Sequence, residues 1–340
     1  MHEGSVEISV PKAKVVSKEL PVFYNPVMKS NRDFTVLLLQ TLGRKLQICD
    51  PLAGSGIRVL RLLKETPEAA GNVLVNDYRE GFVKDLKKEL KGNKLSSKGI
   101  TFGNRDANKF MMEQKGFDYV DIDPFGTPNP FLDVAVKKLS RDGILAVTAT
   151  DTSSLCGSYP NVCKRRYWAK PLRTHVMHEV GLRILIRKVQ LLGTQYDKAL
   201  VPVFSYSKDH YMRIFFLCKK GKKACDNVLK EHGMYEESGP MWLGALGDVN
   251  IVKKMLSKGK WLDDKLYGFL KTIFGELQVG TVGFYDMHQL GKDTGVSELP
   301  KLSYVLEKVR KKHAAALTHF RPNSIRSTIT KKEIEKIIKN

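Results

Sequence analysis

The sequence lacks the features that would place the protein in a membrane or in an oxidising compartment. It has no apolar run of transmembrane length, no signal peptide and no lipidation motif, so we expect a soluble, intracellular protein with no membrane partner. A prokaryotic source would imply the cytoplasm, and a eukaryotic source would also allow the nucleus. The five cysteines form no C-x-x-C pair, and their odd number and scattered positions favour free thiols.

Acidic residues are few compared with basic ones. There are 57 Lys and Arg against 36 Asp and Glu, which gives a net charge of +21. This excess predicts a polyanionic partner, with nucleic acid first and an anionic membrane surface as the alternative. The 340 residues favour two domains, and no obligate protein partner is evident.

Short strand-like runs alternate with helical patterns over the first half of the chain. The strands are expected at 46–49, 73–76, 100–103, 117–122 and 144–148, and the helices at 57–63, 81–90, 131–139 and 176–192. This order predicts an α/β fold with a mostly parallel, Rossmann-like sheet. Two further runs, 199–206 and 211–218, predict a hairpin that adds an antiparallel edge.

The Lys- and Gly-rich stretch 219–223 is the best linker candidate, so we expect a domain of residues 1–222 and a smaller α+β domain of residues 223–340. Its last forty residues hold eleven Lys and Arg against three Glu. Helices at 284–290 and 302–309, a strand at 314–320 and a basic helix at 331–340 indicate a winged-helix-like module. We expect such a module to bind RNA through its phosphates.

A glycine turn follows the first strand and opens the first helix. Asp50, Gly54 and Gly56 belong to this turn, where the backbone can approach a ligand. Asp77 ends the next strand, at the position that meets ribose hydroxyls in doubly wound sheets. After the third strand, Asp106 and Ala107 are placed to contact an adenine. Since Val59 replaces the third glycine of a dinucleotide fingerprint, the pattern favours S-adenosyl-L-methionine over NAD.

The run 121–128, Asp-Ile-Asp-Pro-Phe-Gly-Thr-Pro, breaks the fourth strand with a rigid turn. Asp123 can accept a hydrogen bond from an exocyclic amine, and Phe125 can stack on a nucleobase. Methyl transfer to an amine needs little more, because the cofactor supplies the electrophile. Asp121 is expected to point away from Asp123 and to be structural. By itself, the turn fits DNA, RNA or protein amines.

A basic segment, residues 164–173, packs five cations and two aromatic residues into ten positions. It follows the fifth strand, so we expect it on the same rim as Asp123. Phosphate contact with some base stacking is the expected role. The candidate RNA-binding residues are Lys164, Arg165, Arg166, Lys170 and Arg173.

Several motifs resemble those of the tRNA (guanine-N2)-dimethyltransferase family, whose members are class I S-adenosylmethionine-dependent methyltransferases. They lie at 121–128, 21–28 and 31–33, then at 148–152, 155–157 and 178–183, and finally at 239–244, 284–288 and 318–322. They span essentially the whole chain in order. The resemblance implies transfer of methyl groups from S-adenosyl-L-methionine to the guanine N2 amine at tRNA position 26.

The resemblance also implies roles for single residues. Asp123 falls on the catalytic carboxylate, and Phe23 and Phe125 fall on the aromatic residues that bracket the target base. The residues that fall on cofactor contacts are Arg32, Arg58, Asp77, Asp106 and Ala107.

The chain departs from the family pattern in one respect. Many members carry a four-cysteine metal cluster before the segment at 239–244, whereas Cys218 and Cys225 stand there without partners, so we predict no metal. Two other functions stay open: an amino methyltransferase that acts on DNA or protein, and a non-catalytic RNA-binding protein with a relict methyltransferase fold. The intact carboxylates at 77, 106 and 123 disfavour the second of these.

Overall fold

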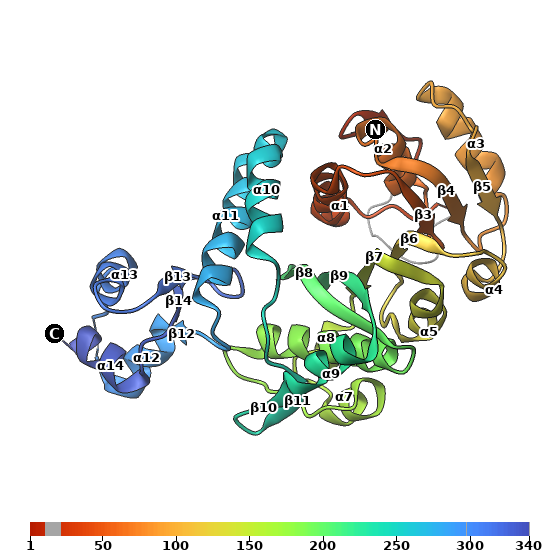
Figure 1. Ribbon diagram of the computed structural model, residues 1–340. Coiled ribbons are helices and arrows are strands. Elements are labelled where there is room, and N and C mark those ends of the chain that lie inside the picture. Colours follow the sequence, from red (N-terminus) through yellow and green to blue (C-terminus); the bar gives the residue numbers. More distant parts are fainter. Residues whose placement is uncertain (11–21, 297, 340) are drawn as a thin grey trace.

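The computed structural model describes residues 1–10, 22–296 and 298–339. Pro21, which opens the N-terminal motif, and Asn340, which ends the predicted last helix, lie outside these residues. Within them, a seven-stranded sheet forms the centre of the larger part of the molecule (Figure 1). Its strands, in spatial order, are β5 (Ile100–Gly103), β4 (Ala70–Asn76), β3 (Leu46–Asp50), β6 (Phe117–Ile122), β7 (Leu139–Ala149), β9 (Tyr211–Lys220) and β8 (Lys198–Lys208).

The predicted α/β fold is confirmed. Strands β3 to β7 run parallel to one another, and β9 pairs antiparallel with both β7 and β8. The hairpin therefore closes the sheet as expected, with its antiparallel strand one place inside the edge. The order reverses between β3 and β6, which is where doubly wound sheets bind ligands.

Helices cover both faces of this sheet. One face packs on α4 (Ala107–Met112), α5 (Asn129–Lys138) and α8 (Met177–Thr194). The other face packs on α1 (Lys29–Leu42), α2 (Ile57–Glu65) and α3 (Phe82–Gly92), together with α10 (Val249–Lys258) and α11 (Asp264–Val279). None of the described helices is long and apolar enough to span a bilayer. Two helices from beyond residue 222 thus complete the core of the first part.

The linker prediction at 219–223 is wrong. Lys219 and Lys220 end β9, where they pair with Ala199 and Lys198, and α9 (Lys222–Lys230) begins two residues later. Exposed lysines do not interrupt a strand when the ladder bonds are made by the backbone. The division of the chain at residue 222 stays a prediction.

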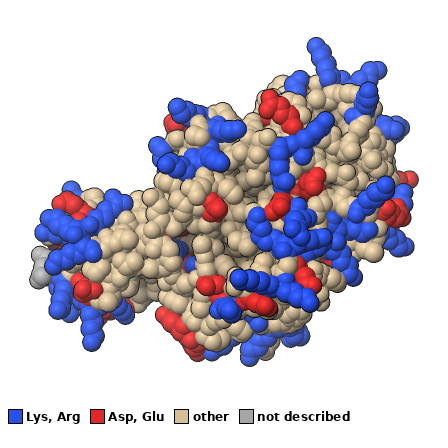
Figure 2. Space-filling model, in the orientation of Figure 1, with Lys and Arg blue, Asp and Glu red and all other residues tan. Residues whose placement is uncertain are grey.

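The last part of the chain forms a small module (Figure 1). This module has its own apolar core. Its elements are β12 (Tyr285–Asp286), α12 (Met287–Thr294), α13 (Leu302–Arg310), β13 (Ala315–Leu317), β14 (Ser324–Ser327) and α14 (Lys331–Lys339). Strand β14 lies between β12 and β13 and pairs antiparallel with both. The winged-helix-like character of this module stays a prediction. Lys and Arg side chains are dense over this module at the left of Figure 2.

A helix over 284–290 was expected, but its first residues form β12 instead. Tyr285 and Asp286 pair with Ile325 and Ser324, and the Asp286 carboxylate then accepts the Gln289 N–H as the cap of α12. The long-range strand pairing overrides the local helical pattern.

Shorter elements connect these layers. They are β1 (His2–Glu3), β2 (Val6–Glu7), the 3-10 turns Pro26–Met28 and Gly259–Trp261, α6 (Thr152–Leu155), α7 (Pro160–Tyr167), β10 (His232–Tyr235) and β11 (Ser238–Trp242). Mutual backbone hydrogen bonds between Lys170 and Gly239 join the loop that follows α7 to strand β11.

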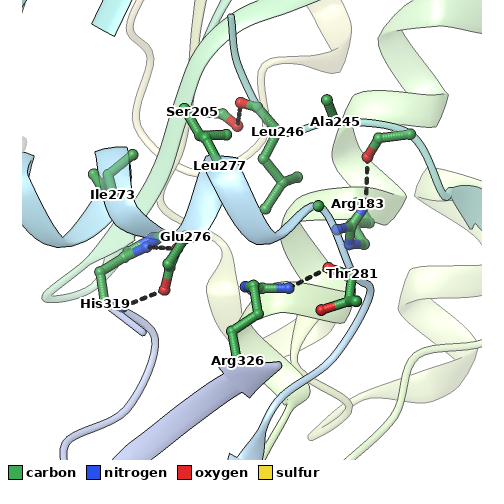
Figure 3. A pocket seen from close by; sticks show the side chains of 12 residues that line it. Arg183, Ser205, Ala245, Leu246, Ile273, Glu276, Leu277, Thr281, His319 and Arg326 are labelled. Carbon is green, nitrogen blue, oxygen red and sulfur yellow. Dashed lines mark hydrogen bonds and ion pairs between the residues drawn. The ribbon is translucent and has the colours of Figure 1, made fainter. Parts of the chain in front are cut away.

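Buried ions join the C-terminal module to α8. Figure 3 shows Arg183, Arg326, Glu276 and His319, which belong to this group. Glu179 accepts hydrogen bonds from Arg183 at 2.9 Å and from Arg326 at 2.8 Å and 3.0 Å. Beside this group, Glu276 of α11 binds the ring of His319 at 2.7 Å, and the His319 ring accepts a bond from the Ser207 N–H at 3.3 Å. A cavity of about 20 Å³, room for one water molecule, is lined by Arg183, Arg326, Glu276 and His319 among others. We call Glu179, Arg183, Arg326, Glu276 and His319 the junction network.

Candidate active site

A cavity of about 830 Å³ opens at the carboxyl ends of β3, β4 and β6. Parallel strands bring these ends to one edge, so Asp50, Asp77 and Asp123 meet there although they are far apart in the sequence. The volume of this cavity suits a ligand of the size of a nucleoside together with a second chemical group bound beside it. The predicted site residues that line it are Phe23, Arg32, Asp50, Gly54, Arg58, Asp77, Asp123 and Phe125.

The glycine turn is tied to the end of β4. The Gly54 N–H donates to Asp77 Oδ2 at 2.7 Å, and the Arg79 N–H donates to Asp77 Oδ1 at 2.9 Å. Gly54 has a φ of +57°, which favours glycine. Each Asp77 oxygen retains a second lone pair, so a ribose hydroxyl can still donate to this carboxylate.

Asp50 is a buried carboxyl group whose Oδ2 has no hydrogen-bond partner among the described residues. Burial raises the pKa of Asp50 to about 8; Arg58 opposes this rise, while Asp121, Asp123 and Asp77 add to it. This oxygen lies at the cavity wall, where the charge of a cationic ligand would favour the ionised carboxylate and offset the cost of burying it. The ammonium group of S-adenosyl-L-methionine has that charge, so the residues present fit this cofactor.

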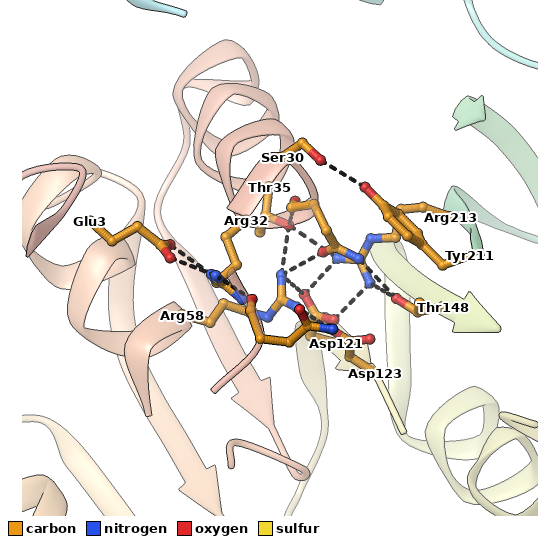
Figure 4. Close-up of polar contacts among 12 residues, drawn as sticks. Glu3, Ser30, Arg32, Thr35, Arg58, Asp121, Asp123, Thr148, Tyr211 and Arg213 are labelled. Atoms are coloured by element: carbon orange, nitrogen blue, oxygen red, sulfur yellow. Dashed lines mark hydrogen bonds and ion pairs between the residues drawn. The ribbon is translucent and has the colours of Figure 1, made fainter. Parts of the chain in front are cut away.

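Asp123 is held by Arg58, as Figure 4 shows. Arg58 donates to Asp123 Oδ2 through Nη2, and its Nη1 donates to Asn31 and Thr35 at 3.0 Å each. The Asp123 side chain is 16 % exposed, on the cavity side. Within the described residues, Asp123 Oδ1 accepts no protein hydrogen bond, so this oxygen can receive an N–H from a substrate.

Asp121 has the structural role that we expected, but the expectation that it points away from Asp123 is wrong. Residues two positions apart share one face of a strand. Both carboxylates accordingly approach Arg58, with Asp121 Oδ2 at 3.4 Å from Nη1. Asp121 is fully buried and also binds Tyr119 at 2.6 Å and Arg213 at 2.8 Å.

The rings of Phe23 and Phe125 lie at the cavity with their centroids 4.3 Å apart, at an angle of 78°. Phe125 is 56 % exposed, which is unusual for a phenylalanine. The edge-to-face contact leaves no gap of base thickness between the two rings. A base that entered between them would have to separate them.

Other predicted cofactor residues are placed differently. Arg32 lines the cavity but is paired with Glu3 through two bonds of 2.6 Å and 2.5 Å. Gly56, Asp106 and Ala107 do not line the cavity as the described residues form it. Gly56 has a packing role, because a Cβ there would lie 2.6 Å from Leu86. Asp106 caps α4 by accepting the Lys109 N–H at 2.9 Å, and Ala107 is buried behind it.

Sequence reasoning missed Tyr78 and Arg213. Tyr78 follows Asp77, lines the cavity and is 81 % exposed, so its ring is free to pack on a ligand. Its place directly after the strand-end carboxylate was the available signal. Arg213 is fully buried in β9, and a lone charge within the apolar run 211–218 was the signal there.

The basic segment contacts the turn that follows Asp123. The Tyr167 hydroxyl donates to Asp151 at 2.6 Å and forms a second hydrogen bond with the Thr127 hydroxyl at 2.9 Å. Asn129 donates to the Arg166 carbonyl at 2.9 Å. Much of the segment is helix α7, whose Tyr167 is buried. The side chains of Lys164, Arg165, Arg166, Lys170 and Arg173 are all exposed. The basic segment 164–173 therefore lies beside the turn that follows Asp123, as the sequence predicted.

No group of three or more His, Cys, Asp or Glu in the described part of the chain is arranged to hold a metal ion. All five cysteines, Cys218 and Cys225 among them, are buried free thiols.

The sheet order, the antiparallel strand next to the edge and the strand-end carboxylates around one cavity define a class I methyltransferase. A family model described as N2,N2-dimethylguanosine tRNA methyltransferase matches residues 4–237 and 232–339. The chain belongs to this family.

Known relatives extend over the whole chain. A tRNA (guanine(26)-N(2))-dimethyltransferase of Thermococcus kodakarensis is 37 % identical, with 100 % of this chain and 98 % of the relative covered. A tRNA (guanine(26)-N(2)/guanine(27)-N(2))-dimethyltransferase of Aquifex aeolicus is 35 % identical, with 99 % and 94 % covered. The structure of Trm1 from Pyrococcus horikoshii with S-adenosyl-L-methionine superposes with a TM-score of 0.91, at 33 % identity and 99 % coverage of both chains.

Proposed function

We propose that this protein transfers methyl groups from S-adenosyl-L-methionine to the exocyclic N2 amine of guanine at position 26 of tRNA, giving N2,N2-dimethylguanosine. The observation that carries the proposal is Asp123, held by Arg58 through one oxygen while the other faces a cavity beside Phe23 and Phe125. Family membership narrows the amine to a tRNA guanine.

The cofactor supplies an electrophilic methyl group on a sulfonium centre. Asp77 would hold its ribose, Asp50 its ammonium group and Tyr78 its adenine ring, because these groups line the cavity at matching positions. Asp106, Ala107, Arg32 and Gly56 are proposed to act from the surrounding shell.

Asp123 would accept an N–H of the guanine amine. This bond raises the nucleophilicity of a nitrogen whose lone pair is delocalised into the ring, and the carboxylate can take the proton as the methyl arrives. Correct alignment of the amine supplies much of the remaining rate. Phe23 and Phe125 would hold the base once it has left the helical stack.

Recognition of tRNA would use two basic surfaces. The exposed cations at 164–173 flank the catalytic turn, and those of α13 and α14 cover the C-terminal module (Figure 2). Because these side chains present charge rather than a groove-reading pattern, we propose recognition of shape and phosphates.

The test is a transfer assay with methyl-labelled S-adenosyl-L-methionine and an unmodified tRNA transcript, followed by digestion to nucleosides. We expect label in dimethylguanosine, and none in a transcript that carries adenosine at position 26. Label only in DNA or protein would support another amino methyltransferase. Binding of cofactor or tRNA without transfer would support a non-catalytic RNA-binding protein.

A further inference from the structure

Strand β9 carries a buried charge that the proposed chemistry does not use directly. Arg213 is charged, yet it has no exposed surface, and its neighbours in the strand are apolar. It stands opposite Thr148 of β7 and reaches past that strand to Asp121 of β6. Removing an arginine from water is costly, so its partners must compensate.

Arg213 is the first member of a chain of alternating charges that ends at Asp123 (Figure 4). It binds Asp121 through two bonds of 2.8 Å each. Asp121 in turn lies 3.4 Å from Arg58, and Arg58 binds Asp123. Burial would raise the pKa of Asp121, but Arg213 and Arg58 hold it below its ordinary value, so this carboxylate stays charged.

Two hydroxyl groups join the arginines from the other side. Thr35 Oγ1 accepts from Arg58 at 3.0 Å and from Arg213 at 3.1 Å. Thr148 Oγ1 accepts from Arg213 at 3.0 Å and from Asn31 at 3.2 Å. These bonds fix both guanidinium groups relative to the strand that carries Asp123.

We propose that Arg213 is a positioning residue that acts on Asp123 through Asp121 and Arg58, an inference that rests on the proposed methyltransferase function. Because Arg213 neutralises Asp121, Arg58 needs only a long contact with Asp121 and keeps Nη2 for Asp123. Without Arg213, Arg58 would be the one arginine left beside Asp121 in the described part of the chain. It would be drawn toward Asp121 and away from Asp123.

Two substitutions therefore have opposite consequences. Arg213→Gln leaves Asp121 undercompensated, and we expect kcat to fall by about thirtyfold, since misplacing a catalytic base costs one to two orders of magnitude. Adding Asp121→Asn removes the charge that attracts Arg58. The double variant should recover kcat to within about threefold of the wild type.

The experiment measures kcat, KM for tRNA and thermal unfolding for the wild type, Arg213→Gln, the double variant and Arg183→Gln. Arg183 is an equally buried arginine with no contact to Asp123, so its variant should lose stability and keep kcat. KM for tRNA should stay within about threefold throughout, because no RNA contact is removed. If Arg213→Gln does not fold, Arg213→Lys, which keeps the charge but not the paired bonds, should lower kcat by about fivefold.

Normal turnover in a folded Arg213 variant would overturn the proposal. So would a double variant as slow as the single one, since a purely structural loss predicts no recovery of the chemical step. An inactive wild-type protein would instead refute the proposed function itself.

Discussion

The active site and the junction between the two parts of the molecule are both built on buried arginine–carboxylate networks, yet the two networks end differently. At the junction, Glu179 receives bonds from Arg183, Arg326 and the Gly283 N–H, and every one of these partners is buried protein. At the active site, the chain from Arg213 ends at Asp123, which faces the cavity. The junction network therefore has all its charges paired within the protein, whereas the active-site network leaves one carboxylate oxygen facing the cavity.

The pKa values of buried carboxyl groups in the two regions differ as well. Burial would raise the pKa of Glu179, but Arg326 and Arg183 outweigh it and lower that pKa to about 2. Burial raises the pKa of Asp50 to about 8, against the opposition of Arg58. The junction compensates its carboxylate fully, while the cavity leaves one undercompensated, as a site for a cationic ligand would.

The largest expected effect is on the open end of the active-site network. Asp123→Ala should lower the transfer rate by about 10³-fold to 10⁴-fold, since it removes the acceptor for the amine proton. Affinity for tRNA, measured by filter binding, should change by less than about threefold. Near-normal turnover would remove Asp123 from the mechanism.

A substitution in the junction network should change the stability of the protein rather than the rate of methyl transfer. Glu179→Gln leaves two buried arginines undercompensated, so we expect the free energy of unfolding in urea to fall by about 3 kcal/mol. The matched control is Glu113→Gln, which breaks an exposed pair with Arg105 and should cost less than about 1 kcal/mol. Equal losses in both variants would contradict a special role for the junction.

The two regions should also respond to pH in opposite directions. Because the folded-state pKa of Asp50 is raised, wild-type stability falls as the pH rises from its ordinary 3.8 to about 8. Asp50→Asn should therefore gain stability relative to the wild type across this window, by roughly 1 kcal/mol per pH unit. Urea unfolding at several pH values measures this difference.

Glu179 has a lowered pKa, so its contribution is present above its ordinary 4.5 and is lost as the pH falls toward about 2. The stability difference between Glu179→Gln and the wild type should shrink over that range. A constant difference at either site would refute the charge assignment there.

The smallest expected effect comes from a substitution at the protein surface. Arg165→Gln should weaken tRNA binding by about threefold and reduce the slope of log affinity against log salt by about one, if Arg165 contacts a phosphate. Lys88→Gln, on α3 at the far edge of the sheet, is the control and should change neither. An unchanged slope for Arg165→Gln would remove this residue from the interface.

Much of the fold was predictable because it depends on local pattern. The strands at 46–49, 100–103 and 117–122 and the helix at 57–63 lie within β3, β5, β6 and α2 as expected. The predictions from sequence failed where pairing with a distant strand overrides the local sequence pattern, as in β12 and at the end of β9. The burial of Arg58 and Arg61 in helix α2 was also not predictable, because charged residues in a helical sequence pattern usually indicate an exposed face.

The sequence by itself determined where the strand-end carboxylates lie, because Asp50, Asp77 and Asp123 follow from strand periodicity and parallel connection. Only the tertiary structure decided which charges meet. Arg58 and Asp123 are 65 residues apart, and Arg213 and Asp121 are 92 apart. Pairs at such separations leave no periodic trace, and their free energy depends on burial that exists only after the sheet has formed.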